Sequence, residues 1–280
     1  MNLLFSAIAS FFFLSLNAQY YYKDIITTLE TNQQMNFLKT NKVQSVTATG
    51  YNPQGIKNPD FSEIQEFLPN RNAWKITTQN DSSNQTVLVN LLDKENRLIS
   101  SSDTTTPLKI ITSYQYDNTG KILWIANKTI DTTQLINETE EHKWQYTETG
   151  IPLKMLRIMN AHDTTEIRFS LDEKGNVIDE RSYKRGVEGE MTYYYYDDNN
   201  RLTDIVRYNK KLNKLIPDYL FEYDGNNRVI QKITTFSNLN QGYLIWRYAF
   251  NENGLKTKEA LFNRDKTLAG KIEYSYSFLQ

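Results

Sequence analysis

The stretch Tyr116-Asp117-Asn118-Thr119-Gly120-Lys121-Ile122 is the clearest copy of a short phrase that recurs along the chain and decides its fold. The phrase is an aromatic residue or leucine, usually an aspartate, two variable residues, and then glycine or asparagine. The seven copies begin at Leu92, Tyr116, Tyr146, Leu171, Tyr196, Tyr223 and Phe250. The second positions of successive copies lie 24, 30, 25, 25, 27 and 27 residues apart. A regular period of this size indicates one supersecondary unit that is stacked many times.

The residues that flank each phrase alternate between apolar and polar, which is typical of half-buried β-strands. In the last segment, Ile272, Tyr274, Tyr276 and Phe278 alternate with polar residues. Within the phrase, the Asp or Asn side chain can accept hydrogen bonds from the backbone that follows it. The Gly or Asn three residues later tolerates the positive φ that a tight hairpin needs. Each copy therefore predicts a β-hairpin.

Longer polar connections, such as residues 184–189 and 209–217, separate the hairpins. This order predicts an all-β fold, an antiparallel meander of roughly fourteen or more strands. The pattern does not decide whether the sheet is open, spiralled or closed. Tyr51-Asn52-Pro53-Gln54-Gly55 also fits the phrase, but the 41 residues from Asn52 to Asp93 exceed the period, so we expect an insertion at about 58–80.

The N-terminus predicts export. Leu3 to Leu16 is an almost unbroken apolar run that ends at Asn17-Ala18, and its length suits the apolar core of a secretory signal better than a membrane span. We expect a signal peptide over 1–18, with a buried N-terminal helix as the alternative. The chain has no cysteine, so neither disulfides nor the acylated cysteine of a lipoprotein are expected.

Residues 24–39 lack alternation and instead carry Ile25, Leu29, Met35 and Leu38 at roughly helical spacing, with Asp24 placed to cap the helix. A repeat protein needs an atypical terminal unit over its first edge. The expected domains are therefore a helical cap at 19–42 and a β-hairpin repeat domain at 43–280. No turn follows the final strand at 271–279, so we expect its edge to be covered by the helix or to dock a partner.

The phrase resembles the YD repeat of the rearrangement-hotspot and teneurin-like family, which reads Tyr-Asp, two variable residues, Gly, a basic residue and Leu. The copy at 116–122 matches almost position by position, and the copies at 196–202 and 223–229 match with Asn in place of Gly. The similarity covers roughly 87–278. It implies long, spiralling β-sheets and a short secreted bacterial member of unknown function. The period here is longer than the family's usual one, and we do not expect the family's cargo domain or a toxin capsule.

Residues that could carry catalysis are sparse. The two histidines are His142, on a strand face with Trp144 and Tyr146, and His162 in a polar loop, so the first is expected to be packed and the second solvated. No zinc spacing, nucleophile elbow or phosphate-binding glycine loop is present. The acidic turns at 197–200 and 224–227 lack the ligand spacing of an EF-hand, and nothing selects a carboxylate pair for glycoside hydrolysis. We expect no metal, no cofactor and no enzymatic activity.

Aromatic residues are abundant, with 19 Tyr, 13 Phe and 4 Trp. They could form internal ladders across strands, or an exposed row that stacks on a sugar or seats a protein. The candidate binding residues are Trp124, Trp144, Tyr194, Tyr196, Trp246 and Tyr248. The near balance of 32 basic and 33 acidic residues argues against nucleic acid. The expected partner is an unknown protein or polysaccharide of the cell envelope.

The sequence therefore predicts a non-enzymatic, exported binding or scaffold module without a transmembrane helix in the mature chain. One alternative is an outer-membrane β-barrel, and another is a carbohydrate-active protein that uses exposed aromatics. Charges on both faces of the predicted strands argue against the membrane barrel, because Asp179 and Arg181 alternate with Glu180. A basic residue in the middle of a lipid-facing strand costs about 2–4 kcal/mol.

Overall fold

The structure is a computed structural model that describes residues 20–80, 85–103, 108–131, 133, 135–209, 212–236 and 242–279. The predicted signal peptide therefore lies outside the described residues. The helical elements are α1 (Lys23–Thr40) and the short 3-10 helix η1 (Pro69–Arg71). The strands are β1 (Val43–Tyr51), β2 (Lys57–Leu68), β3 (Ala73–Gln79), β4 (Gln85–Leu92), β5 (Leu98–Asp103), β6 (Leu108–Tyr116), β7 (Ile122–Asp131), β8 (Ile136–Tyr146), β9 (Pro152–Met159), β10 (Asp163–Leu171), β11 (Val177–Lys184), β12 (Val187–Tyr196), β13 (Leu202–Asn209), β14 (Lys214–Tyr223), β15 (Val229–Thr235), β16 (Tyr243–Phe250), β17 (Lys256–Phe262) and β18 (Leu268–Phe278).

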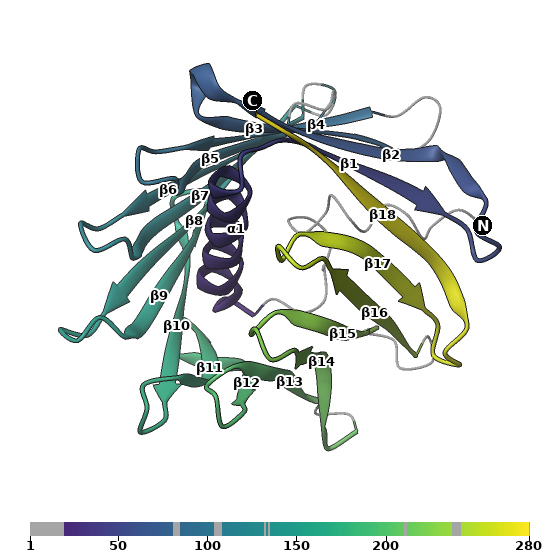
Figure 1. Cartoon of the computed structure of the whole chain (residues 1–280). Coiled ribbons are helices and arrows are strands. Elements are labelled where there is room, and N and C mark those ends of the chain that lie inside the picture. Colours follow the sequence, from purple (N-terminus) through teal and green to yellow (C-terminus); the bar gives the residue numbers. More distant parts are fainter. Residues whose placement is uncertain are drawn as a thin grey trace.

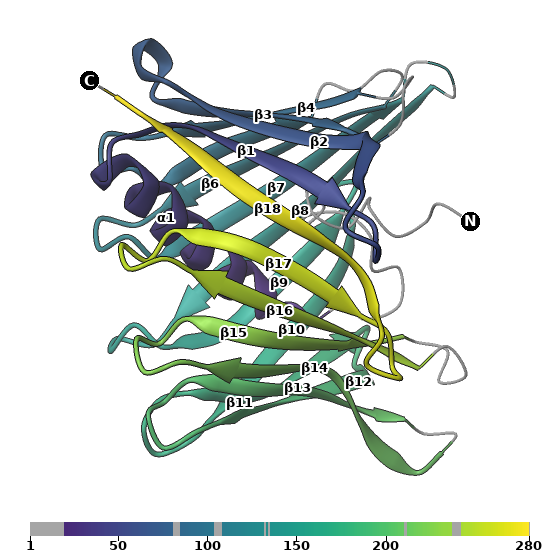
Figure 2. The ribbon, with the colours of Figure 1, turned by 45° about the vertical axis from the view of Figure 1, so that its right-hand side comes forward.

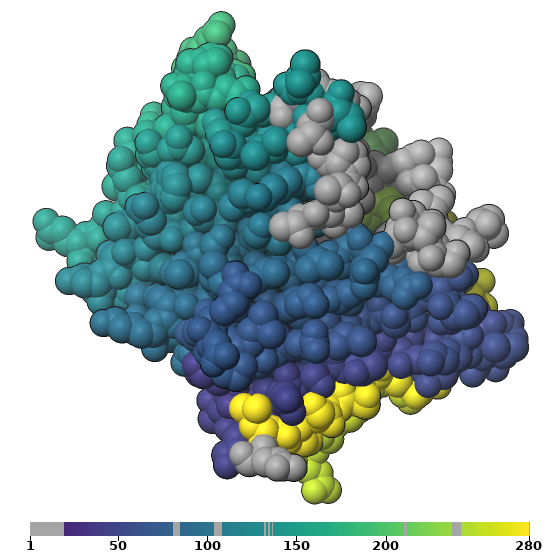
Figure 3. Space-filling model, turned by 90° about the horizontal axis from the view of Figure 1, so that it is seen from above, coloured from purple at the N-terminus to yellow at the C-terminus, as the bar shows by residue number. Residues whose placement is uncertain are grey.

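The sheet is an antiparallel meander that closes into a barrel. Each strand pairs with the next strand in sequence, and β18 also pairs with β1, from Val43 opposite Phe278 to Tyr51 opposite Lys271. Figure 2 and the space-filling view in Figure 3 show the yellow β18 alongside the purple β1. The all-β meander is thus confirmed, and the expected free edge at 271–279 is wrong, because closure pairs the backbone groups that an open edge would expose.

Five of the seven turns are built by an aspartate, as the sequence predicts, and Thr147 and Asn251 take its place in the other two. Asp117 Oδ1 accepts hydrogen bonds from the backbone N–H groups of Thr119 at 2.8 Å and Lys121 at 2.9 Å. Gly120 has a φ of +91°, and Asn200 fills the same position of a later copy with a φ of 65°. Glycine avoids the steric penalty at positive φ, and asparagine tolerates it better than most residues. Local chemistry therefore fixes where the hairpins turn.

The tyrosine and the basic residue of the phrase connect one hairpin to the next. The hydroxyl of Tyr146 donates to the carbonyl of Ile122 at 2.7 Å, and the hydroxyl of Tyr223 donates to the carbonyl of Leu202 at the same distance. The Arg201 guanidinium lies over the Tyr223 ring, 4.9 Å from its centroid. These contacts join neighbouring repeats through a hydrogen bond and a cation–π interaction.

The predicted helix exists, but it lies inside the barrel (Figure 1). Its Met35 and Leu38 are 7% and 6% exposed and belong to the same buried cluster as Trp74 on the wall. Helix α1 therefore fills the lumen rather than covering a sheet edge, since pairing between β1 and β18 leaves no edge there to cover.

Residues 58–80, expected as an insertion, are part of the wall. They form most of β2, then η1, and then β3, which pairs with β2 from Ser62 opposite Gln79 to Leu68 opposite Ala73. The turn between these strands ends at Asn72, whose φ is 45°. The 41 residues between Asn52 and Asp93 thus contain one additional hairpin, whose turn does not have the repeated phrase.

Candidate functional site

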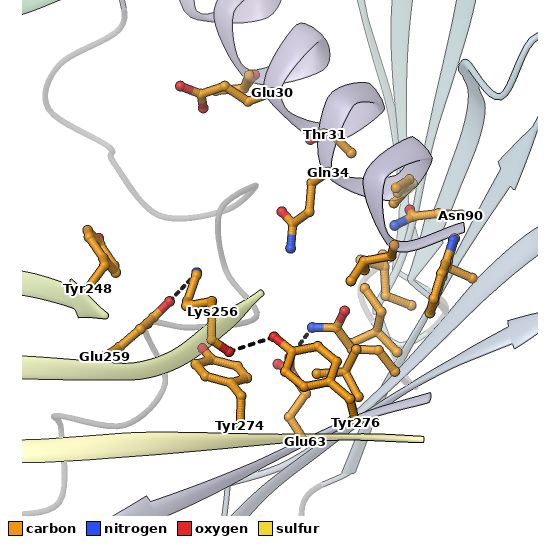
Figure 4. Close-up of a pocket in the computed structure, with 18 of the residues that line it drawn as sticks. Glu30, Thr31, Gln34, Glu63, Asn90, Tyr248, Lys256, Glu259, Tyr274 and Tyr276 are labelled. Carbon is orange, nitrogen blue, oxygen red and sulfur yellow. Dashed lines mark hydrogen bonds and ion pairs between the residues drawn. The ribbon is translucent and has the colours of Figure 1, made fainter. Parts of the chain in front are cut away.

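The interior of the barrel contains a cavity of about 200 Å³ between α1 and the wall formed by β1–β4 and β15–β18. Glu30, Thr31 and Gln34 face it from the helix (Figure 4). The opposite lining comes from alternate residues of the strands, because every second side chain of a strand points into the lumen. The cavity therefore combines a polar stripe of the helix with the inner face of the sheet.

Aromatic rings supply much of the strand lining, namely Trp74, Trp246, Tyr248, Tyr274 and Tyr276. The Tyr276 hydroxyl donates to the carbonyl of Lys256 at 2.6 Å, and burial raises the pKa of Tyr276 to about 12. Burial also raises the pKa of Tyr248 and Tyr274 well above the usual value. These side chains are neutral at physiological pH and present ring surface together with hydroxyl groups.

The charged groups of the cavity are Glu30, Glu63, Glu259, Lys232 and Lys256. Lys256 forms an ion pair with Glu259. Burial raises the pKa of Glu30 and of Glu63 and lowers the pKa of Lys232. Burial thus favours the neutral form of each of these three groups.

Glu63 is held by its own neighbours on the wall. It accepts hydrogen bonds from Gln65 Nε2 at 2.8 Å and from Thr78 Oγ1 at 3.2 Å. Its hydrogen-bonding capacity is therefore largely used within the protein.

Two polar atoms beside the helix lack a partner among the residues that the structure describes. They are Trp74 Nε1 and Asn90 Oδ1, and their residues are 1% and 2% exposed. Trp74 and Asn90 lie directly opposite each other on β3 and β4, and both line the cavity. A buried donor or acceptor without a hydrogen bond lowers the stability of a fold by about 1–3 kcal/mol. The wall thus has one such donor and one such acceptor on adjacent strands.

At the other end of the helix axis, the chain that precedes α1 is attached to β11. Glu180 accepts hydrogen bonds from the backbone N–H groups of Tyr21 at 2.6 Å and Tyr22 at 2.8 Å. Burial raises the pKa of Glu180 to about 7, although these hydrogen bonds favour its charged form. The helix has no side-chain N-cap of its own, so the expected cap at Asp24 is wrong, and Glu180 satisfies backbone donors just before the helix.

Asp24 instead belongs to a buried chain of charges. Its Oδ2 lies 2.6 Å from His142 Nδ1, His142 Nε2 lies 2.8 Å from Glu140 Oε1, and Arg157 Nη2 donates to Glu140 Oε2 at 2.6 Å. Burial would lower the pKa of His142, but the two carboxylates outweigh burial and raise it to about 9. The chain binds the helix to β8 and β9.

The six aromatic residues that the sequence proposes for binding do not lie together in the structure. Trp246 and Tyr248 line the cavity. Trp144 and Tyr194 are 4% and 2% exposed, and they contact Phe169 and Tyr22 respectively in the core beside the chain leading into α1. Tyr196 donates to the carbonyl of Val177 within the wall, while Trp124 bonds to Glu141 on the outside of β7 and β8.

Sequence reasoning missed the residues that give the cavity its polarity. Glu259 and Lys232 occupy inward positions beside Tyr248 and Trp246, their partners on adjacent strands. A charged residue on a strand face that also carries large apolar residues is a signal of a polar interior, and it is visible in Glu63, which shares its face with Phe61 and Phe67. His142 is packed and His162 is exposed, as predicted.

Three further features concern metal ions and membranes. Among the described residues, no group of three or more His, Cys, Asp and Glu side chains could hold a metal ion. The acidic turn at 197–200 is satisfied internally, because Asp197 accepts from the backbone of Asn199 and Arg201. Within the same residues, no helix has the length and apolar character needed to cross a membrane.

No family model matches the chain, and no curated protein matches it in sequence. A Tc holotoxin pore from Photorhabdus luminescens is similar over 78% of this chain, which spans 12% of the toxin chain, at 11% identity and a TM-score of 0.35. A porin-like protein from Bacteroides uniformis is similar over 84% of this chain and 98% of its own, at 9% identity and a TM-score of 0.43. At these scores neither neighbour establishes a family or a function for this chain.

Proposed function

We propose that this protein is a non-enzymatic binding module that holds a small polar molecule in the cavity beside α1. The observation that carries this proposal is the cavity itself, about 200 Å³ in volume, between α1 and the wall of the barrel. A concave site with aromatic walls and a few convergent polar groups is the usual form of a small-molecule site. The apolar run at 3–16 supports a location in the cell envelope or outside the cell.

The outer surface supports a barrel that is surrounded by water. Ion pairs lie on the outside of the wall. Lys143 Nζ is 3.2 Å from Glu141 and Arg181 Nε is 3.4 Å from Asp179 along single strands, and Lys154 Nζ is 3.5 Å from Glu166 across two neighbouring strands. The side chains of Lys143 and Arg168 are 51% and 61% exposed on this surface. A lipid-facing band avoids such residues, because a basic group at the membrane midplane costs about 2–4 kcal/mol.

A cavity-filling variant tests the proposal. Thr31→Trp on α1 places an indole in the space that the ligand would occupy, and Thr47→Trp makes the same change on the outer face of β1. A thermal-shift screen with neutral sugars, amino acids and small organic acids should raise the Tm of the natural protein and of Thr47→Trp. The same compounds should leave Thr31→Trp unchanged, and equal shifts in all three proteins would refute a lumen site.

The outer-membrane barrel is the second candidate, favoured by the closed antiparallel sheet. It requires the protein to partition into detergent or lipid. If the chain from Gln19 onward stays monodisperse in detergent-free buffer and does not float with liposomes, this candidate fails. The resemblance to YD repeats stays a prediction. An envelope protein or polysaccharide as partner is also a prediction, and cross-linking of the purified protein in envelope fractions tests it.

A further inference from the structure

We infer that the cavity binds a small organic cation, whose ammonium group lies between Glu30 on α1 and the ring of Tyr248 on β16. This inference rests on the proposed function and adds the charge and the chemical class of the ligand. Three properties of the lining carry it. They are a carboxylate that is open to the cavity, aromatic rings that already attract ammonium groups, and an excess of negative charge.

Glu30 is a carboxylate that a ligand in the cavity can reach. It forms no hydrogen bond or ion pair with another residue that the structure describes. Although the barrel surrounds Glu30, this residue is exposed and projects from α1 into the cavity (Figure 4). Burial raises the pKa of Glu30, and the positive charge of Lys232 opposes this effect. A cationic ligand would act in the same direction as Lys232 and favour the charged carboxylate.

The aromatic rings of the opposite wall already attract ammonium groups of the chain itself. Lys256 Nζ lies 5.2 Å from the centroid of the Tyr248 ring and 5.5 Å from that of Tyr274. Lys232 Nζ lies 5.9 Å from the centroid of the Trp246 ring. An ammonium group within about 6 Å of a ring centroid is attracted by the negative face of the ring. Tyr248 and Trp246 are only half-buried, so part of their surface is accessible from the cavity.

The lining carries more negative than positive charge. Its charged residues are three glutamates and two lysines, namely Glu30, Glu63, Glu259, Lys232 and Lys256, which gives a formal charge of −1. Lys256 compensates Glu259 through an ion pair. Burial raises the pKa of Glu63, and repulsion from Glu259 raises it further. A monovalent cation would bring the formal charge to zero, whereas a neutral ligand would leave the excess and an anion would increase it.

The volume limits the ligand to one small compound. About 200 Å³ is below the range of roughly 300–1,000 Å³ that drug-sized ligands occupy. Thr31 and Gln34 lie beside Glu30 on the same helix and also line the cavity. Their hydroxyl and amide groups can donate or accept a hydrogen bond from a polar substituent of the ligand. A short amine or a quaternary ammonium compound with one hydroxyl group fits these properties.

Isothermal titration calorimetry on the natural protein tests the charge of the ligand with two matched pairs of probes. Choline is compared with 3,3-dimethyl-1-butanol, in which a carbon replaces the charged nitrogen, and butylammonium is compared with 1-butanol. At least one ammonium compound should bind about tenfold more tightly than its neutral partner, which lacks both the attraction to Glu30 and the cation–π contact. If neither ammonium compound binds more tightly than its neutral partner, the inference is wrong.

Protein variants then test the position of the ammonium group. Glu30→Gln keeps the size of the side chain but removes its charge, and should weaken the better ammonium compound about tenfold. Glu188→Gln makes the same change at an exposed position of β12 and should bind like the natural protein. Unchanged affinity in Glu30→Gln overturns the inference, because the cation then lies elsewhere.

A second variant should change affinity in the opposite direction. Lys256→Met removes an ammonium group that repels the ligand and leaves Glu259 without its ion pair, so the ammonium compound should bind more tightly. Damage to the fold would not produce tighter binding. Lys258→Met, on the exposed side of the same strand, should leave the affinity unchanged. Equal affinities in Lys256→Met and Lys258→Met would contradict the inference.

The inference and the proposed function fail in different ways. If neutral compounds or organic acids bind, with binding lost in Thr31→Trp, and no ammonium compound exceeds its neutral partner, the organic-cation inference is wrong and the binding module stands. If no compound, cations included, depends on the space beside Thr31, both are wrong.

Discussion

His142 Nδ1 lies 2.6 Å from Asp24 Oδ2, and this contact joins the helix in the lumen to strand β8 of the wall. The side chains of His142 and Asp24 are only 6% and 11% exposed, so the pair is shielded from solvent and salt. Trp144 Nε1 also approaches Asp24 Oδ2, at 3.4 Å. The charge of His142 therefore contributes to holding α1 inside the barrel.

This dependence predicts how stability changes with pH. The pKa of His142 is raised to about 9 in the fold, above its ordinary value of about 6.5, so protonated His142 stabilises the native state. The contribution is complete below about pH 6.5 and is lost as the pH rises through 9, up to about 3 kcal/mol. Urea unfolding between pH 6 and 10 should show this loss.

His142→Gln should lower the free energy of unfolding at pH 6 and remove the fall between pH 6.5 and 9. His162→Gln provides the matched control, because His162 is exposed and its Nδ1 contacts the carbonyl of Asn160 in the same loop. If the free energy of unfolding of His142→Gln still falls between pH 6.5 and 9 as it does in the natural protein, His142 is not the cause of the fall.

Glu180 should hold the chain that enters the helix. Its two oxygens accept separately from Tyr21 and Tyr22, and glutamine offers only one acceptor oxygen. Hydrogen exchange of one of these two amides should accelerate about tenfold in Glu180→Gln, because its hydrogen bond to the carboxylate is lost. Glu188→Gln, a change at an exposed position of β12, should leave them protected.

Glu180 also has its own pH range. Its pKa is raised to about 7 in the fold, above its ordinary value of about 4.5, so the folded state retains a proton that the unfolded chain has lost. The associated stability is complete below about pH 4.5 and falls as the pH rises through 7. Glu180→Gln should lack this fall, whereas Glu188→Gln should keep it.

The tyrosine hydroxyls should contribute additively to the wall. Tyr146→Phe, Tyr196→Phe and Tyr223→Phe each remove one hydrogen bond to the carbonyl of the preceding hairpin, with a cost of about 1 kcal/mol each. The triple variant should lose about 3 kcal/mol in denaturant unfolding, because the three acceptor carbonyls, on Ile122, Val177 and Leu202, lie on different strands. Tyr195→Phe alters an exposed outer residue and should cost less than about 0.5 kcal/mol; equal effects would contradict a structural role for the inner hydroxyls.

Two glycines in equivalent turns should respond oppositely to alanine. Gly120 has a φ of +91°, so Gly120→Ala should cost about 1–2 kcal/mol, while Gly120→Asn should cost less. Gly225 has no positive φ and an added Cβ there meets no atom within 4 Å. Gly225→Ala should therefore be neutral or stabilise by about 0.4–1 kcal/mol. Thermal unfolding of the three variants measures the difference, and equal losses would contradict the turn argument.

The sequence alone predicted the elements whose cause is local. Asp117, Gly120 and Lys121 lie within five residues, and their hydrogen bonds form a turn wherever the phrase occurs. The helix at 23–40 and the inward alternation of the strands follow from equally short-range patterns. The alternation also places Trp246 and Tyr248 on one strand face, and that face lines the cavity; their role in binding stays a prediction.

Only the tertiary structure decided that the sheet closes and that α1 lies inside it. Closure joins Val43 to Phe278 across nearly the whole chain, and the same alternation would suit an open or a spiralled sheet. The helix enters the lumen because Asp24 meets His142 and the backbone of Tyr21 meets Glu180, residues more than a hundred positions away. The cavity exists only once these elements enclose it, so Trp74 and Asn90 gain their unpaired atoms from packing that no local pattern specifies.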